Sequence, residues 1–149
     1  MVRFLALSVL TVLAGRAVPL YMEKKELLEL LHQRMIEEVQ DYAIILMDID
    51  GTILTWNKGA ELIKGYRAEQ IIGQNFRLFY LPQHREQQLP EQLLQQAVRE
   101  GRLRHIGQRV RKNGTTFWGS VLITALHDDE NRVVGFTKLT RELRDNEIA

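Results

Sequence analysis

The sequence predicts an α+β domain built around an antiparallel sheet. After Gly101, apolar and polar residues alternate in three runs, which an Asn-Gly turn at 113–114 and a loop at 128–131 separate. Two shorter apolar runs come earlier in the chain, with an Asp-Gly turn at 50–51 between them. Strands joined by such short turns pair antiparallel, whereas a doubly wound parallel sheet requires long crossovers.

The residues before this domain fall into two parts. Residues 1–21 contain an apolar run at 4–14, which is shorter than the roughly 20 residues of a membrane-spanning helix and resembles the core of a leader peptide. We interpret them either as a leader or as a segment foreign to the native protein. The stretch at 23–40 predicts an amphipathic helix, since apolar residues recur at helical spacing and Glu and Lys fill the other side. Its apolar stripe consists of Leu27, Leu31, Met35 and Val39.

The first elements of the domain surround the Asp-Gly turn. Strands are predicted at 43–48 and 53–56, because both runs are rich in apolar residues and the turn joins them directly. Asn57 occupies the N-cap position of a short helix at 58–64, and Gly65 ends that helix.

The later elements begin with helices and end with long strands. A second short helix is predicted at 68–72, and a longer helix within 83–99 begins or kinks at Pro90. The period of the pattern then changes from helical to two, which indicates strands. The predicted strands are 102–112, 116–126 and 133–143.

Composition limits the chemistry of the chain. The formal net charge is +1 and 26% of the 149 residues are charged, which is typical of a soluble globular protein and gives no reason to expect a nucleic-acid partner. The chain has no Cys, which excludes disulfides, thiolate metal sites and cysteine nucleophiles, and no metal cluster is predicted. We expect a cytoplasmic location, with membrane association through residues 4–14 as the alternative.

The motif Asp-Ile-Asp-Gly-Thr at 48–52 has two interpretations. After an apolar strand, it resembles the nucleophile loop of the haloacid-dehalogenase-type phosphatases, in which Asp48 would attack phosphorus and Asp50 would act as acid and base. That fold needs a crossover after its first strand, and here the acidic pair at 128–129 precedes Lys138, which reverses the order of the family. We therefore favour a structural turn, and keep the Mg²⁺-dependent phosphatase as the alternative function.

A much longer stretch, from about residue 41 to residue 143, carries a second resemblance. Its segments are DYAI (41–44), DGTILTWNKGAELIKGY (50–66), EQIIG (69–73), FYLP (79–82), RVRKNGTTFW (109–118), VLITALHDD (121–129) and GFTKLTREL (135–143). Together they resemble a PAS domain of the type found in bacterial sensor histidine kinases. The resemblance implies a five-stranded antiparallel sheet in the order 2-1-5-4-3, with short helices on one face and a ligand pocket between them. It assigns 22–40 to an N-terminal flanking helix, 41–144 to the PAS domain and 145–149 to a tail.

The resemblance and the strand alternation together predict which side chains face the pocket. These candidates are Leu94, Arg109, Phe117, Val121, Ile123, Phe136, Lys138 and Thr140. The charges of Arg109 and Lys138 would suit an acidic metabolite, although an ion pair between Arg109 and Glu61 would give Arg109 a purely structural role. A photoactive flavin would need a Cys, and a haem would need a His on the helix at 91–99; because both are absent, we expect neither cofactor. The ligand, if there is one, stays unknown.

The predicted function is that of a non-enzymatic sensory and dimerisation domain, a fragment of a two-component signalling protein. Trp118 and Leu122 face away from the pocket, so we expect them to join the stripe at 27–39 in a homodimer interface. The expected partners are a second copy of the chain, the output domain of the parent protein and a small-molecule ligand. A ligand-free structural dimerisation module is the second alternative.

Overall fold

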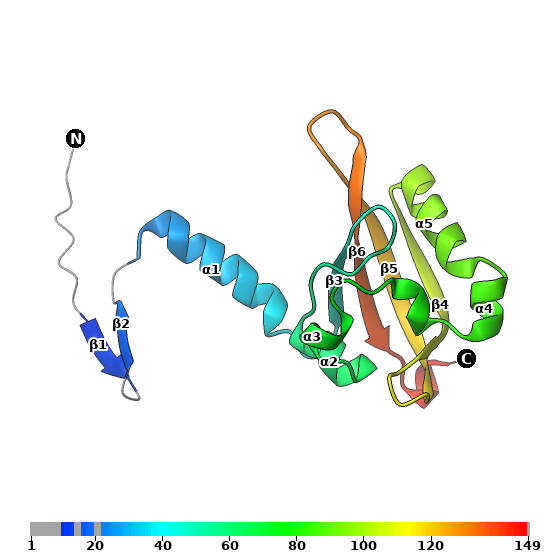
Figure 1. Ribbon diagram of the computed structural model, residues 1–149, viewed down its shortest axis with the longest axis horizontal. Helices are drawn as coiled ribbons and strands as arrows, with labels where there is room; N and C mark the ends of the chain where they lie inside the picture. Colours follow the sequence, from blue (N-terminus) through cyan, green and yellow to red (C-terminus); the bar gives the residue numbers. More distant parts are fainter. Residues whose placement is uncertain (1–9, 14–15, 20–21, 149) are drawn as a thin grey trace. The chain divides into compact units, whose positions relative to one another are not determined.

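The computed structural model describes residues 10–13, 16–19 and 22–148, which divide into two compact units (Figure 1). The first unit, Met1–Met35, contains a two-stranded antiparallel sheet of β1 (Leu10–Leu13) and β2 (Arg16–Pro19). Much of the apolar run predicted as a leader lies outside the described residues.

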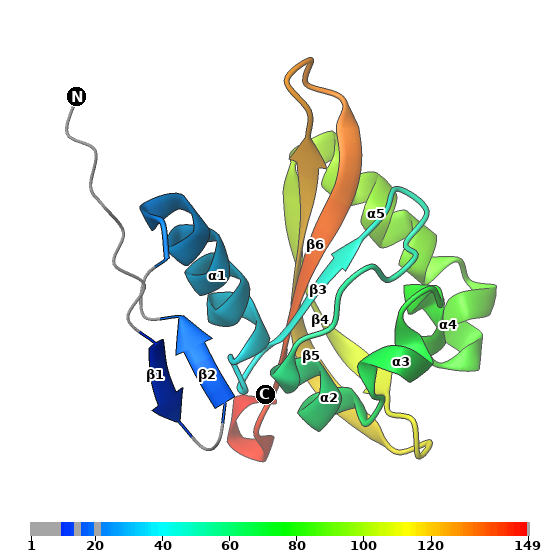
Figure 2. The same ribbon diagram turned by 60° about the vertical axis from the view of Figure 1, so that its left-hand side comes forward.

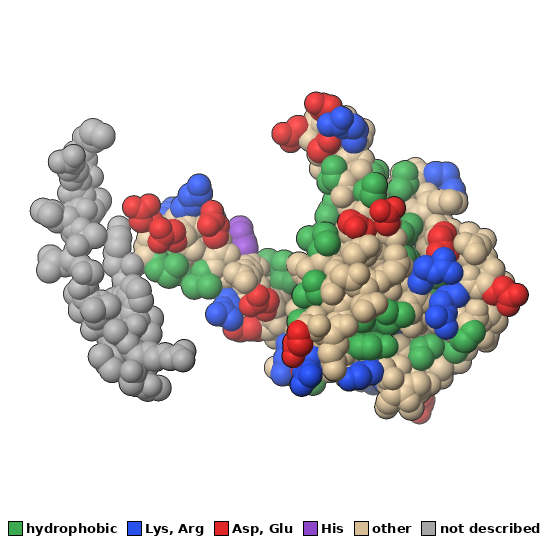
Figure 3. Space-filling view, in the orientation of Figure 1, with side chains coloured by type: hydrophobic (Ala, Val, Ile, Leu, Met, Phe, Trp, Pro, Cys, Tyr) green, Lys and Arg blue, Asp and Glu red, His purple; other side chains and the backbone are tan. Residues whose placement is uncertain are grey.

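Helix α1 (Lys24–Glu37) matches most of the helix predicted at 23–40. None of its side chains is buried, and Figure 3 shows hydrophobic side chains gathered along one side of it. Among the helices that the structure describes, none is both long enough and apolar enough to cross a bilayer.

The second unit, Ile36–Ala149, is built on a four-stranded antiparallel sheet with the strand order β3-β6-β5-β4 (Figure 2). Its strands are β3 (Ala43–Met47), β4 (Arg102–Val110), β5 (Thr116–His127) and β6 (Val133–Glu142). Every second side chain of β5 is buried from Phe117 to Ala125, because successive side chains point to opposite faces. The predicted α+β class, the antiparallel pairing and the three long strands are therefore confirmed.

The fifth strand expected at 53–56 does not form in the described structure, so the predicted order 2-1-5-4-3 is wrong in its first member. Ile53 forms a single bridge to Met47 of β3, in which the N–H of Leu54 donates to the Leu46 carbonyl at 2.8 Å, and the N–H and C=O of Ile53 itself bond to the loop at 73–74 on the other side. The hydroxyl of Thr55 accepts the backbone N–H of Leu46 at 3.1 Å, and so takes the place of a backbone carbonyl of a pairing strand. The pairing with β3 therefore ends after one bridge, and the N–H of Leu46 is satisfied by a side chain.

Short helices connect β3 to β4. They are α2 (Lys58–Lys64), α3 (Ala68–Ile71), the 3₁₀ helix η1 (Phe76–Phe79), α4 (Pro82–Glu86) and α5 (Leu89–Glu100), and a 3₁₀ helix η2 (Asp145–Glu147) follows β6. α5 begins with Pro90 in its first turn and contributes Leu93, Leu94 and Ala97 to the core that also holds the buried face of β5. Helix α2 has the predicted bounds, and Gly65 ends it with φ of +82°.

Asn57 joins the end of α1 to the start of α2. Its side-chain oxygen accepts the N–H of Ala60, and its amide nitrogen lies 3.0–3.1 Å from the carbonyl oxygens of Ile36, Val39 and Tyr42. Gly59 donates its N–H to the Val39 carbonyl at 2.9 Å. A Cβ atom at Gly59 would lie 1.9 Å from the Tyr42 oxygen, so only glycine permits this approach. The chain at 36–42 is therefore fixed to the first turn of α2.

Candidate functional site

Three cationic side chains from three different elements are fully buried in the core of the second unit. Lys64 comes from the last turn of α2, Arg109 from β4 and Lys138 from β6, and each has 0% of its surface exposed. Buried charges are costly unless they are paired. This cluster is the most unusual feature of the core and is our candidate functional site.

The two lysine amines lie around one aromatic ring. The Nζ atom of Lys64 is 4.1 Å from the centroid of the Phe79 ring, and that of Lys138 is 5.3 Å from it. Phe117 is a second neighbour, 5.6 Å from the Lys64 amine. Lys138 also donates a hydrogen bond of 3.3 Å to the hydroxyl of Thr140. Cation–π contacts of this kind stabilise a charge only in part.

Arg109 has neutral neighbours. Its guanidinium carbon lies 4.1 Å from the centroid of the Tyr80 ring, and its terminal nitrogens contact the Gln108 carbonyl at 2.9 Å and His105 Nδ1 at 3.2 Å. Its Nε–H is buried without a hydrogen-bond partner in the described part of the chain, and the buried Tyr80 hydroxyl has the Arg109 side chain as its partner. The ion pair expected with Glu61 is wrong, because Glu61 lies on the exposed side of α2 while Arg109 points into the core.

Burial lowers the pKa of all three side chains in this cluster, and repulsion between them adds to the effect on the lysines. Burial, followed by the charge of Arg109, lowers the pKa of Lys64 from 10.5 to about 7. Burial, followed by repulsion from Lys64 and Arg109, holds the pKa of Lys138 well below its usual value. Burial also lowers the pKa of Arg109. No carboxylate is among the buried polar residues that the structure describes.

All eight residues predicted for the pocket are buried on the same side of the sheet. They are Leu94, Arg109, Phe117, Val121, Ile123, Phe136, Lys138 and Thr140. The burial of Lys64 was not predicted from the sequence, because lysines are rarely buried and the seven residues of α2 give only a short pattern from which to identify its buried side. The signal was present, since Lys64 follows the buried Ala60 and Ile63 at helical spacing.

Two glycines face each other beside Arg109. Gly107 of β4 pairs with Gly119 of β5, which leaves a part of the buried sheet surface without side chains. A Cβ atom at Gly107 would lie 3.1 Å from a terminal nitrogen of Arg109 and 2.6 Å from the His105 ring. The glycine pair therefore makes room for the guanidinium to lie along the sheet.

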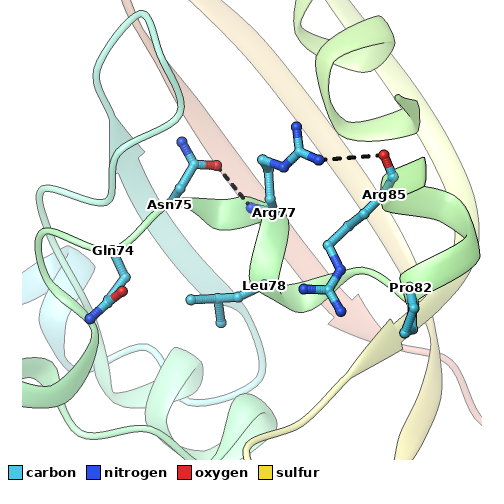
Figure 4. A pocket seen from close by; sticks show the side chains of 6 residues that line it. All are labelled: Gln74, Asn75, Arg77, Leu78, Pro82 and Arg85. Carbon is cyan, nitrogen blue, oxygen red and sulfur yellow. Dashed lines mark hydrogen bonds between the residues drawn. The ribbon is translucent and has the colours of Figure 1, made fainter. Parts of the chain in front are cut away.

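Apart from this buried cluster, a hollow lies at the surface beside α4 (Figure 4). Its lining residues are Gln74, Asn75, Arg77, Leu78, Pro82 and Arg85. The hollow is open to solvent, and the Arg77 guanidinium already forms an ion pair with Glu91. The charge of Arg77 is therefore neutralised within the chain, and we do not regard this hollow as the functional site.

Asp48, His84 and His105 are the residues that could have served in phosphate chemistry or in metal binding. The Asp48 carboxylate accepts the backbone N–H groups of Asp50 and Thr52, both at 2.9 Å, and thereby builds the turn after β3. His84 lies in α4, and His105 contacts Arg109. Within the described residues, no group of three His, Asp or Glu side chains is arranged to hold a metal ion.

Comparison with known proteins identifies the fold. Residues 27–141 match the family model described as the PAS fold. Over 115 residues, the chain is 43% identical to the Two-component system protein A of Emericella nidulans; this match covers 77% of the chain but only 17% of that protein.

Solved structures show the same architecture. The PAS domain of a protein from Colwellia psychrerythraea is 24% identical, with a TM-score of 0.71 over 78% of this chain and 97% of that one. An RNA-binding Light-Oxygen-Voltage receptor is 20% identical, with a TM-score of 0.66 over 84% of this chain and 37% of that one. The PAS domain of a LuxR-family regulator from Burkholderia thailandensis, solved with ethanol, is 18% identical, with a TM-score of 0.62 over 74% and 96%. The chain therefore belongs to the PAS family, whose members serve as sensory domains in signal transduction.

Proposed function

We propose that this chain is the sensory and dimerisation domain of a two-component signalling protein, and that it passes a change in its core to the flanking helix. The observation that carries the proposal is the 43% identity to a two-component system protein over 115 residues. The chain spans only 17% of that relative, and an output domain in the parent protein is part of this proposal.

The flanking helix offers a surface for a second copy of the chain. Leu27, Leu31 and Met35 of α1 are 43%, 53% and 64% exposed, although they are large apolar residues. Val39 is half-buried. Apolar side chains aligned on one side of an exposed helix are typical of helix–helix dimers. We infer that α1 pairs with its copy in a homodimer.

The outer face of the sheet supports the same proposal. Trp118 is 38% exposed and Leu122 on the same strand is half-buried, and Ile106 of the neighbouring strand, 57% exposed, pairs with Ser120 between them. Apolar residues on an open sheet face favour a covering partner. We place these residues in the dimer interface together with α1, and a cytoplasmic location is part of the same proposal.

A connected set of contacts leads from α1 to the buried cluster. The end of α1 bonds to Asn57, Asn57 caps α2, and the last residue of α2 is Lys64. A change in the surroundings of Lys64 would thus act on a short rigid helix whose other end holds the flanking helix. This is the physical basis for transmission by a shift between two packings.

Light scattering tests the dimer on which this proposal depends. The chain should scatter as a dimer, and Leu31→Asp should give a monomer, because an unpaired charge in an apolar interface is strongly unfavourable. Glu29→Lys, on the polar side of α1, is the control and should stay dimeric. A monomeric parent chain at high concentration would contradict the proposal.

A further inference from the structure

We propose that Lys64, Arg109 and Lys138 form a binding site for a small organic acid, whose carboxylate supplies the counter-ion that the core lacks. This inference rests on the proposed sensory function and names the chemical class of the ligand.

The first argument is the charge of the core. The described core contains three fully buried cationic side chains and no fully buried acid, and the half-buried Glu91, one of whose oxygens is buried, pairs with Arg77. A carboxylate among them would replace repulsion by attraction on all three sides. Buried cations are normally paired with acids, so an anion from outside the chain is the simplest partner.

The second argument is that the buried hydrogen-bond donors of the cluster lack an acid as acceptor. Arg109 Nε is buried without a hydrogen-bond partner among the described residues, and the Lys64 amine and the Tyr80 hydroxyl have the basic side chains of Lys138 and Arg109 as partners in place of an acid. Unsatisfied buried donors are rare in native proteins, and each one is costly. The Tyr80 ring lies against the Arg109 guanidinium, so two of these donors belong to neighbouring groups. A carboxylate has two oxygens and about four acceptor positions, enough to satisfy all of these donors.

Uncharged lysines alone do not account for the cluster. A neutral Lys138 amine can accept a hydrogen bond from the Lys64 ammonium group. This hydrogen bond raises the pKa of Lys64 and lowers the pKa of Lys138. Arginine, however, keeps its charge at neutral pH even when its pKa is lowered. The Arg109 guanidinium therefore still requires a counter-ion.

The walls of the site favour an organic acid over inorganic phosphate. The surroundings of the cations are aromatic and apolar, with Phe79 and Phe117 against Lys64 and with Tyr80 against Arg109. Such walls suit the apolar body of an organic acid, whereas a phosphate ion would lose hydration on every side. The planar guanidinium also matches the planar carboxylate.

Binding should be coupled to proton uptake. An anion stabilises protonated Lys64 and Lys138, and in the free protein the pKa of Lys64 is about 7. The affinity should therefore be highest below pH 7 and fall as the pH rises above it. Of the other ionisable groups around the cluster, Arg111 repels Lys64, Tyr80 and His105 interact with Arg109, Glu91 interacts with Tyr80, and His84 interacts with His105.

Isothermal titration calorimetry of the full chain tests the site. The probes are acetate, succinate, benzoate and inorganic phosphate at equal ionic strength, each in two buffers of different ionisation enthalpy. At least one carboxylate should bind with proton uptake, and Arg109→Gln, Lys64→Met and Lys138→Met should each weaken that binding about tenfold or more. Lys58→Met, an exposed lysine in the same helix as Lys64, should leave it unchanged.

Each other outcome overturns the site. Binding of phosphate alone would exclude an organic acid, and binding that survives in Lys64→Met and Lys138→Met would place the ligand elsewhere. Absence of binding by all four probes would mean that the lysines are neutral structural residues. Because removal of buried charge should not unfold the domain, the lysine variants remain informative even if Arg109→Gln fails to fold. None of these results affects the dimer, so the proposed function is tested separately.

Discussion

Arg111 binds both carboxylate oxygens of Glu142, at 2.6 and 3.1 Å. The same guanidinium donates to the Ile63 carbonyl at 2.9 Å and lies 4.5 Å from the centroid of the Phe117 ring. One side chain thus connects the end of β4, the end of β6 and the last turn of α2. The last turn of α2 also carries Lys64, so this ion pair supports the candidate site from outside.

Arg111→Lys should lower the free energy of unfolding by about 1–2 kcal/mol, because an ammonium group cannot reproduce the two-pronged contact and the bond to Ile63 together. Urea unfolding followed by circular dichroism measures the loss. Lys112→Arg, at the neighbouring exposed position, is the control and should be neutral. An equal effect of both variants would show that the Glu142 contact contributes nothing specific.

Lys64→Met should stabilise the domain near neutral pH. It removes a buried amine and keeps a side chain of similar length, so we expect a gain of about 1–4 kcal/mol in the free energy of unfolding. Urea unfolding of the parent chain and the variant measures the gain. Lys58→Met should give no gain, and destabilisation by Lys64→Met would mean that the amine has a counter-ion within the chain.

The stability of the parent chain should rise with pH. The pKa of Lys64 is about 7 in the folded state against a usual value of 10.5, so the unfolded chain binds more protons between these values. The free energy of unfolding therefore increases from pH 7 towards pH 10.5, while below pH 7 the full cost of burying the charge is present. Lys64→Met should flatten this dependence, and the remaining slope reports Lys138, whose lowered pKa acts in the same direction.

Cysteine cross-linking should locate the dimer contact. The natural chain has no Cys, so Met35→Cys introduces a single thiol into the apolar stripe of α1. Mild oxidation should give a covalent dimer on a non-reducing gel, because equivalent residues approach each other near a two-fold axis. Glu29→Cys, on the polar side of α1, should cross-link much less, and equal yields for both positions would indicate random collision.

Asp48 should affect stability and not hydrolysis. Its Oδ1 atom accepts two backbone N–H groups, a role that asparagine can fill and alanine cannot. Asp48→Asn should therefore be nearly neutral, while Asp48→Ala should cost about 1–2 kcal/mol in urea unfolding. We expect no Mg²⁺-dependent hydrolysis of a phosphate ester by the parent chain. Clear hydrolysis that Asp48→Asn abolishes would restore the phosphatase alternative.

The sequence was sufficient for elements whose signals are local. The bounds of α2 follow from its two caps, and the buried side of β5 follows from strict alternation. The fifth strand could not be excluded in this way, because its first bridge, between Ile53 and Met47, does form and the pairing ends only beyond it. The hydroxyl of Thr55 also competes with backbone pairing, and composition gives no measure of that competition.

The candidate site was predicted in part. Strand alternation, together with the face implied by the resemblance, predicted Arg109 and Lys138 on the side that faces the helices, and both are buried in the structure. The burial of Lys64 was missed, because a lysine at the end of an amphipathic helix usually reaches solvent. The expected pairing of Arg109 with Glu61 failed because Glu61 lies on the exposed side of α2 while Arg109 is buried in the core, a relation that depends on how the helix is rotated against the sheet.

The contacts of Asn57 determine where the domain can be cut. Its amide reaches the carbonyl oxygens of Ile36 and Val39, so a fragment that starts at residue 41 would leave this buried amide without two of its acceptors. A chimaera joined between residues 36 and 42 would also replace the backbone on which Gly59 rests. Junctions upstream of Ile36 keep the contacts between residues 36–42 and the first turn of α2. A recombinant sensor made from this chain should therefore carry the last turn of α1 with it.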